Sequence, residues 1–253
     1  MNNCRRCDCD VPLEFDIAMA FQPIVDLHTC TLFAYEALVR GVNGEGAGQV
    51  LSKVTEKNRY SFDQTCRTTA IRIASELGCN TRLSINFLPN AVYEPEACLR
   101  ETLKAAQKYG FPYQSIIFEV TEHEKVDVAK ILDIFRTYQK QGFMTAIDDF
   151  GEGYSGLNLL AMFQPDIIKL DMLLIRGIDK DPAKQAIFSG MALITERLGI
   201  KLLAEGVETE GEFTYLREKG VRYMQGYYIC KPLFMTLADE KQVFGELDRH
   251  YDH

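Results

Sequence analysis

The stretch VDVAKILDIFRTYQKQGFMTAIDDFG, residues 126–151, decides the fold class. Apolar residues recur at helical spacing over residues 126–141, Gly142 follows, and residues 144–148 form a short apolar run that leads into two aspartates. Glycine directly after a helix is the common left-handed stop. The stretch therefore predicts a helix, a turn and a buried strand with carboxylates at its end.

The same unit recurs along the chain. Apolar runs predict strands at residues 18–25, 33–39, 82–87, 115–120, 144–148, 167–170, 201–204 and 222–228. Helical periodicity predicts helices at residues 49–57, 62–77, 94–109, 126–141, 183–198, 210–219 and 237–248. Five of these helices are followed by a glycine: Gly78, Gly110, Gly142, Gly199 and Gly220. This alternation predicts an α/β protein, a TIM-like (β/α)8 barrel.

The N-terminal part of the chain is expected to depart from this alternation of strands and helices. Only residues 26–32 separate the first two strands, too few for a crossover helix, so an antiparallel strand is expected near the N-terminus. No linker interrupts residues 15–250, which are predicted to form one domain. Residues 1–14 are predicted to be a disordered tail. Its Cys4, Cys7 and Cys9 leave open a zinc site that would lack a fourth ligand.

Composition excludes several classes of protein. The 253 residues, 47% of them hydrophobic, suffice for one large core. The net charge of −8 argues against binding nucleic-acid polymers or anionic membranes, so a phosphate-ester substrate would need bridging cations. No run approaches the roughly 20 apolar residues of a membrane span. Without a secretory signal at the start, the eight cysteines are expected to be thiols in the cytoplasm.

Polar residues stand where the predicted strands end, and in a parallel barrel these ends form one rim. They are Glu36, Asn86, Glu119, Asp148, Asp149, Lys169, Glu205 and Gln225. Clustered carboxylates raise one another's pKa unless cations neutralise them. An all-oxygen set favours Mg²⁺ or Mn²⁺ over zinc. Of the four histidines only His123 is a candidate for this rim, so a histidine-based mechanism is not expected.

Each acidic residue also has a structural interpretation as a helix cap or a solvated loop charge. Asp148 and Asp149 are adjacent, and neighbouring residues of a strand point to opposite faces. The glycines that follow give the backbone freedom to bring both carboxylates to the rim. The alternative is that Asp149 caps the next turn or helix.

The motif Glu36-Ala37-Leu38-Val39-Arg40 resembles the signature of the EAL-domain phosphodiesterases, which hydrolyse cyclic di-GMP. Further similar blocks follow in order across residues 21–233. They are Gln22-Pro23-Ile24-Val25, Ser84-Ile85-Asn86, Phe118-Glu119-Val120-Thr121-Glu122, Asp148-Asp149-Phe150-Gly151, Ile168-Lys169-Leu170-Asp171, Ala204-Glu205-Gly206-Val207-Glu208-Thr209 and Gln225-Gly226-Tyr227. The ordered set covers nearly the whole chain.

The resemblance implies two Mg²⁺ or Mn²⁺ ions held by Glu36, Asn86, Glu119, Asp148, Asp149 and Glu205, with Asp148 bridging them. It implies that Lys169 and Gln225 position or polarise the attacking water. A two-metal displacement of the 3′-oxygen would give linear 5′-pGpG. Calcium is larger and coordinates more loosely, so Ca²⁺ is expected to inhibit.

The resemblance also assigns substrate contacts and a regulatory loop. Arg40 would hold a phosphate, since its planar fork suits bidentate contact, with Gln22, Leu38, Asp171 and Glu208 as further substrate-binding positions. The structural alternatives are a surface ion pair for Arg40 and an interior hydrogen bond for Gln22. Glu122 is assigned to pin the loop over residues 150–157. Glu152 and Gly156 depart from the family pattern there, which predicts reduced or more regulated turnover.

A homodimer is expected near residues 150–157 and the helix that follows. Leu157, Leu159, Leu160, Met162 and Phe163 place five large apolar residues in seven positions, apolar on more than one face. The alternative is that they seal the barrel beneath the next helix.

Three functions remain for this chain. Besides an active phosphodiesterase, it is compatible with a degenerate EAL-like domain that binds cyclic di-GMP, or a regulatory protein partner, without hydrolysis. The complete set of six ligand positions favours the enzyme. An unrelated sugar- or phosphate-metabolising barrel would leave the ordered motifs unexplained.

Overall fold

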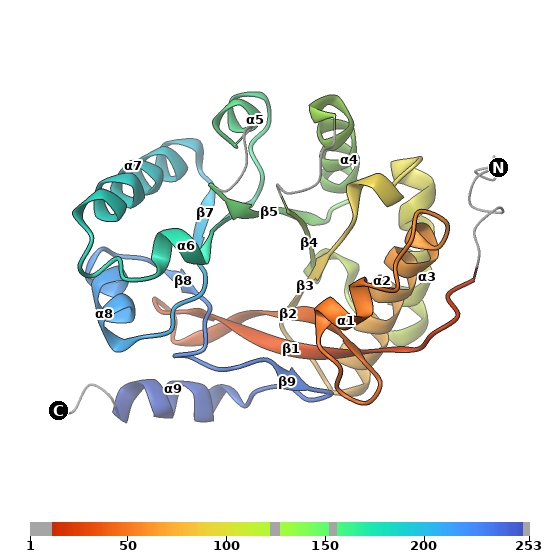
Figure 1. Ribbon diagram of the computed structural model, residues 1–253, viewed down its shortest axis with the longest axis horizontal. Helices are drawn as coiled ribbons and strands as arrows, with labels where there is room; N and C mark the ends of the chain where they lie inside the picture. The colour runs from red at the N-terminus through yellow and green to blue at the C-terminus, as the bar shows by residue number, and fades with distance from the viewer. Residues whose placement is uncertain (1–11, 122–126, 152–155, 250–253) are drawn as a thin grey trace.

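A long antiparallel hairpin begins the fold, as the short first connection predicts. In the computed structural model, which describes residues 12–121, 127–151 and 156–249, β1 (Ile17–Asp26) pairs with β2 (Thr31–Gly41) (Figure 1). All ten residues of β1 are buried. A strand covered on both faces reads as a nearly continuous apolar run, which is the pattern of this segment.

Six parallel strands continue the sheet. They are β3 (Arg82–Asn86), β4 (Ile116–Thr121), β5 (Met144–Phe150), β6 (Ile167–Leu170), β7 (Lys201–Ala204) and β8 (Tyr223–Met224). Val25 and Asp26 of β1 pair with β8 and close a barrel of eight strands, while the short β9 (Leu233–Phe234) pairs with Ala20 and Phe21 of β1. The predicted α/β barrel with an antiparallel strand near the N-terminus is confirmed.

Helices surround this barrel (Figure 1). The described residues contain α1 (Ala47–Leu51), α2 (Arg59–Glu76), α3 (Pro95–Tyr109), α4 (Val128–Lys140), α5 (Gly156–Met162), α6 (Met172–Ile175), α7 (Pro182–Leu198), α8 (Glu210–Glu218), α9 (Glu240–Arg249) and 3-10 turns at Pro89–Ala91 and Tyr113–Ser115. None of the helices in these ranges is long and apolar enough to cross a membrane. The five predicted glycine stops all have positive φ, between 69° and 90°.

The predicted bounds of two elements were wrong. The helix expected over residues 49–57 is reduced to the five-residue α1, which starts earlier. The strand expected over residues 222–228 is only β8, because the chain leaves the sheet at Gln225 and turns at Gly226, where a Cβ atom would lie 2.1 Å from the Val207 carbonyl oxygen. The short elements α5, α6 and β9 carry too few residues for a periodic signal.

The C-terminal helix takes the place of a missing crossover helix. α9 lies beside β9 and the hairpin (Figure 1). The Tyr35 hydroxyl of β2 donates to the Ala238 carbonyl at 2.6 Å, and the Leu32 N–H donates to the Glu240 carboxylate at 2.7 Å. The hairpin is therefore covered by the opposite end of the chain.

An apolar layer fills one end of the barrel interior. Its buried side chains come from seven strands and form one cluster: Ile24, Phe33, Ala34, Ile117, Ala146, Ile167, Leu203 and Tyr223. Such interior layers make a TIM-like barrel a packed core rather than a pore. The cluster forms a floor under the carboxyl ends of the strands.

Candidate active site

Polar side chains stand one layer above this floor. Residues two apart in a strand point to the same face, and five of the floor residues are followed by a polar neighbour in the same direction. The pairs are Ala34 and Glu36, Ile117 and Glu119, Ala146 and Asp148, Ile167 and Lys169, and Leu203 and Glu205. The structure thus brings the predicted rim residues together.

Lys169 lies at the centre of this layer and is 1% exposed. Its Nζ lies 2.7 Å from Glu205 Oε1, 2.8 Å from Glu119 Oε2, 3.1 Å from Asp148 Oδ1 and 3.7 Å from Glu36 Oε2. We call these five residues the Lys169 cluster. One ammonium group cannot balance four ionised carboxylates.

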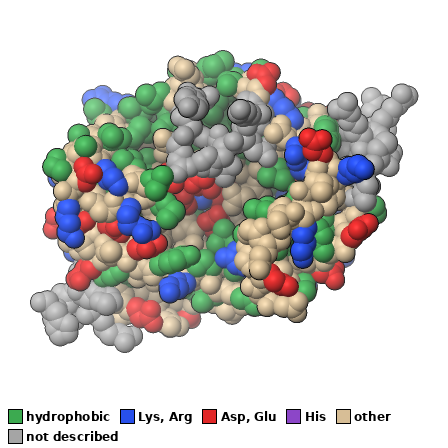
Figure 2. All heavy atoms as spheres, in the orientation of Figure 1, with side chains coloured by type: hydrophobic (Ala, Val, Ile, Leu, Met, Phe, Trp, Pro, Cys, Tyr) green, Lys and Arg blue, Asp and Glu red, His purple; other side chains and the backbone are tan. Residues whose placement is uncertain are grey.

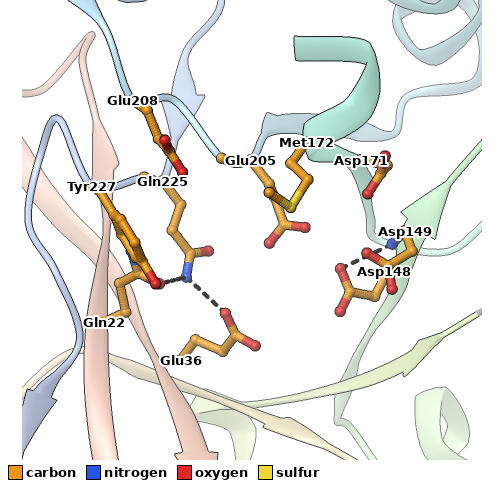
Figure 3. Close-up of a pocket in the computed structure, with 12 residues that line it drawn as sticks. Gln22, Glu36, Asp148, Asp149, Asp171, Met172, Glu205, Glu208, Gln225 and Tyr227 are labelled. Carbon is orange, nitrogen blue, oxygen red and sulfur yellow. Dashed lines mark hydrogen bonds between the residues drawn. The ribbon is translucent and has the colours of Figure 1, made fainter. Parts of the chain in front are cut away.

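Neutral groups orient the carboxylates. Asn86 Nδ2 donates to Glu36 Oε1 at 2.9 Å, and Gln225 Nε2 donates to Glu36 Oε2 at 2.7 Å and to Gln22 Oε1 at 3.1 Å (Figure 3). Gln22 Nε2 in turn donates to the Cys230 carbonyl at 3.0 Å. The interior hydrogen bond considered for Gln22 is present, although Gln22 also lines the cavity described below.

Asp148 and Asp149 both reach this centre despite being adjacent. Asp149 has a φ of +52°, and the pairing of β5 with β6 shifts register between Ile147 and Phe150. The left-handed residue turns the backbone so that both carboxylates face the cavity (Figure 3). Helix α5 is described from Gly156, and residues 152–155, where a cap by Asp149 would act, lie outside the described residues.

Burial and mutual repulsion perturb the cluster. Burial, together with the charges of Glu36 and Asp148, raises the pKa of Glu119 to about 8, although Lys169 opposes the shift. Burial also raises the pKa of Glu205 well above its usual value. Burial acts to raise the pKa of Asp148, but the Lys169 ammonium and the hydrogen bonds from Glu205, Lys169 and the Asp149 N–H together lower it overall. These directions describe a site with more carboxylates than its own cation can satisfy.

The carboxylates fit divalent cations. Two groups each offer oxygen atoms that lie within 4.8 Å of one another: Glu36, Glu119 and Asp148 form the first, and Asp148, Asp149 and Glu205 form the second. Asp148 belongs to both groups. Hard divalent ions such as Mg²⁺ and Mn²⁺ prefer carboxylate oxygens, so each group has the ligand chemistry to hold such an ion.

A cavity of about 240 Å³ opens beside the carboxylates, with acidic side chains at its base (Figure 2). It is lined by Gln22, Glu36, Asp148, Asp149, Asp171, Met172, Glu205, Gly206, Glu208, Gln225, Gly226 and Tyr227. Asp171 caps α6 by accepting from the Leu173 N–H at 2.7 Å, and Glu208 pairs with Arg176 at 2.6 Å. Met172 and Tyr227 were not predicted as lining residues, although Met172 directly follows the motif that ends at Asp171 and Tyr227 belongs to the motif that begins at Gln225.

The two other predicted substrate positions, Leu38 and Arg40, do not line this cavity. Leu38 and Asn86 line a neighbouring apolar cavity of about 260 Å³ between β2, β3 and α2. Arg40 is half-buried, and its guanidinium donates to the Val39 carbonyl at 2.8 Å. Glu122, Glu152, His123 and the cysteines at positions 4, 7 and 9 lie outside the described residues.

The segment expected to form a dimer contact is divided between core and surface. Leu159, Leu160 and Phe163 are buried, whereas Leu157 and Met162 are 61% and 56% exposed. Of the five apolar residues, Leu159, Leu160 and Phe163 therefore pack into the core, and Leu157 and Met162 are the members left for a contact surface. Leu173 of α6 and Ile187 of α7 are also exposed apolar residues.

Comparison with known proteins gives one family. Residues 14–232 match the family model described as "EAL domain". A standalone versatile EAL protein from Vibrio cholerae O395, solved in a c-di-GMP bound form, is 55% identical with a TM-score of 0.87, covering 90% of this chain and 96% of that chain.

Two further relatives are more distant. BlrP1 from Klebsiella pneumoniae, in a manganese and cyclic di-GMP complex at pH 6, is 32% identical with a TM-score of 0.83, over 90% of this chain and 59% of that chain. A probable cyclic di-GMP phosphodiesterase, PdeG of Escherichia coli strain K12, is 29% identical over 228 residues, 86% of this chain and 45% of the relative. The chain thus spans about half the length of the curated relatives it matches.

Proposed function

This chain belongs to the EAL domain family, and we propose that it hydrolyses cyclic di-GMP to linear 5′-pGpG with two divalent cations. The observation that carries the proposal is the Lys169 cluster, in which four carboxylates surround one buried ammonium group. Such a centre attracts cations, and bound cations attract a phosphodiester. The relatives named above support the choice of a cyclic dinucleotide as the substrate.

The proposed cation ligands are Glu36, Asn86, Glu119, Asp148, Asp149 and Glu205. Bound Mg²⁺ or Mn²⁺ would activate water and neutralise charge on the phosphodiester. Ser84 donates a short hydrogen bond to Glu119, which fixes that carboxylate in the buried layer. Ca²⁺ is proposed to bind without supporting turnover, because it accepts a looser geometry.

Gln225 and Lys169 are proposed to act on the attacking water. Gln225 Oε1 is buried and, within the described residues, has no hydrogen-bond donor, while its Nε2 is held by Gln22 and Glu36. An unsatisfied buried acceptor suits a water that must be oriented. Lys169 holds the carboxylates at fixed spacing and supplies positive charge beside the reacting phosphate.

The substrate is proposed to lie across the cavity and the adjoining end of β2. Gln22, Asp171 and Glu208 line the cavity, and the two carboxylates suit the N–H groups of a guanine edge. Arg40 and Leu38 continue β2 beyond Glu36, where Arg40 would meet a phosphate after leaving its contact with Val39. Glu122 remains a proposed support for the loop over residues 150–157.

The deciding experiment is incubation of the chain with cyclic di-GMP and Mg²⁺ or Mn²⁺, followed by chromatography. We expect pGpG to accumulate with either ion and to stop with excess chelator. Binding without product would instead support the receptor function. Absence of both binding and product would overturn the proposal.

We further propose residues 15–250 as one EAL-type domain that forms a homodimer through exposed residues of α5, α6 and α7. Leu157→Glu should dissociate such a dimer, which sedimentation at micromolar concentration would detect. Leu51→Glu, at a 46% exposed position on α1, is the control. A monomeric wild-type chain with full activity would remove the dimer from the mechanism.

A further inference from the structure

Glu212, at the start of α8, is a buried carboxylate outside every motif discussed above, and it is 1% exposed. Its Oε1 accepts from the Gly177 N–H at 2.7 Å. Its Oε2 accepts from the N–H groups of Glu208 at 2.9 Å and Thr209 at 3.0 Å. Burial alone would raise the pKa of Glu212, but these donors hold it below its usual value. The two oxygens thus serve two different segments of the chain.

The first segment is the turn between α6 and α7, residues 176–181. Lys184 Nζ donates to the Arg176 carbonyl at 2.6 Å, and Gln185 Nε2 donates to the Ile178 carbonyl at 2.9 Å. Ile178 is fully buried. The turn is therefore fixed to α7.

The second segment is the loop between β7 and α8, residues 205–209, which carries Glu205 and Glu208 into the cavity. Met172 abuts this loop at Gly206, where a Cβ atom would lie 2.4 Å from the Met172 Cβ. The Arg176–Glu208 ion pair also joins the two segments, but its side chains are 45% and 32% exposed. Solvent screens such pairs and leaves them weak. Buried hydrogen bonds to a carboxylate are stronger.

We infer that Glu212 is a positioning residue, whose carboxylate ties the β7–α8 loop to the α6–α7 turn and so fixes Glu205 and Glu208 in the proposed site. The inference rests on the proposed function for the roles of those two residues. The three backbone groups that face the Glu212 carboxylate from these segments are N–H donors, and the Thr209 side chain also hydrogen-bonds to it. A carboxylate presents two acceptors, whereas an amide of the same shape presents one acceptor and one donor. Only an acidic residue can therefore hold both segments.

Glu212→Gln tests the inference, with Glu218→Gln on the exposed end of the same helix as its matched control. Mn²⁺ affinity is measured by calorimetry without nucleotide. We expect about tenfold weaker binding in Glu212→Gln and no change in Glu218→Gln, as for other residues that orient metal ligands. Amide hydrogen exchange should accelerate in the segment that faces the NH₂ group of the substituted glutamine. That segment is either Gly177 or the pair Glu208 and Thr209. The amides of the barrel strands should stay protected.

The outcomes separate this inference from the proposed function. Mn²⁺ affinity and exchange equal to those of Glu218→Gln would overturn the positioning role. A wild-type chain that binds Mn²⁺ but leaves cyclic di-GMP intact would overturn the proposed function and leave the positioning result standing. Glu212→Ala also removes the capping box with Thr209 and can prevent folding. The positioning role is therefore tested with Glu212→Gln, which keeps the shape of the side chain.

Discussion

Among its described residues the barrel buries two cationic side chains, Lys169 and Arg67, in surroundings that differ in charge balance. Arg67 pairs with one carboxylate, Asp63, at 2.7 Å and donates to the Tyr138 hydroxyl at 3.1 Å. Three aromatic ring centroids lie 5.1–5.9 Å from its guanidinium carbon. Lys169 faces four carboxylates instead.

The difference separates a structural ion pair from a reactive one. One positive and one negative charge inside a ring of aromatic side chains satisfy each other, and Asp63 also accepts from the Leu88 N–H at 2.9 Å. That pair is balanced in charge and lies outside the Lys169 cluster, so its loss should affect folding. The Lys169 cluster is left with excess negative charge, so it depends on cations from outside.

The largest expected effect is that of metal removal, which acts on the Lys169 cluster alone. Excess chelator should reduce turnover to the background rate, and returning Mg²⁺ or Mn²⁺ should restore it. Saturating Mn²⁺ should also raise the melting temperature, because a ligand of the folded state stabilises it. Undiminished turnover in excess chelator would show that the Lys169 cluster does not depend on added metal ions. It would then not differ from the Arg67–Asp63 pair in this respect.

Lys169→Ala and Glu36→Ala sharpen the contrast within the cluster. Lys169→Ala should lower kcat by about 10²–10⁴-fold while substrate still binds, which is the range for loss of a group that acts on the reacting atoms. Glu36→Ala should weaken Mn²⁺ binding as well. Metal titration followed by steady-state kinetics distinguishes them, with Lys140→Ala on the exposed end of α4 as the control. Normal kcat with equal losses of substrate affinity in both variants would contradict these roles.

Arg67→Met should affect stability rather than chemistry. It leaves Asp63 buried and unpaired, which costs about 3–5 kcal/mol of unfolding free energy. Arg72→Met is the matched control, because Arg72 forms the same i,i+4 pair with Glu76 on α2 but is exposed, and its loss should cost about 0.5 kcal/mol or less. Urea unfolding measures both. Similar losses of unfolding free energy in Arg67→Met and Arg72→Met would show that burial does not determine how much such an ion pair contributes.

The smallest expected effect concerns Asp26, whose carboxylate accepts a bidentate contact from the 43%-exposed Arg222. Burial acts to raise the pKa of Asp26, but Arg222 and the His28 N–H lower it overall. Its stabilisation is therefore present above the unfolded-state pKa of about 3.9 and is lost as pH falls through the lower folded value. Asp26→Asn should remove about 1 kcal/mol at pH 7, with a smaller difference near pH 3. A difference that grew as pH fell would contradict this.

The sequence predicts features that depend on local pattern. The glycine stop at Gly142 and the strand leading to Asp148 follow from periodicity over a few residues, and both are present. The glycines after Asp149 were expected to supply the backbone freedom at this turn. Instead, Asp149 itself adopts the left-handed conformation. The bridge from Glu212 to Gly177 was not predicted, because the Glu212 carboxylate and the Gly177 N–H lie 35 positions apart and only the tertiary fold brings them together.

The closure of the barrel has a consequence for the order of folding. The first strand completes the sheet by pairing with residues 223 and 224, and its outer edge pairs with residues 233 and 234. Contacts between such distant positions form slowly. During synthesis β1 must therefore wait until residues 223–234 have left the ribosome before its second edge is paired. This interval is when the nascent protein is most prone to aggregate.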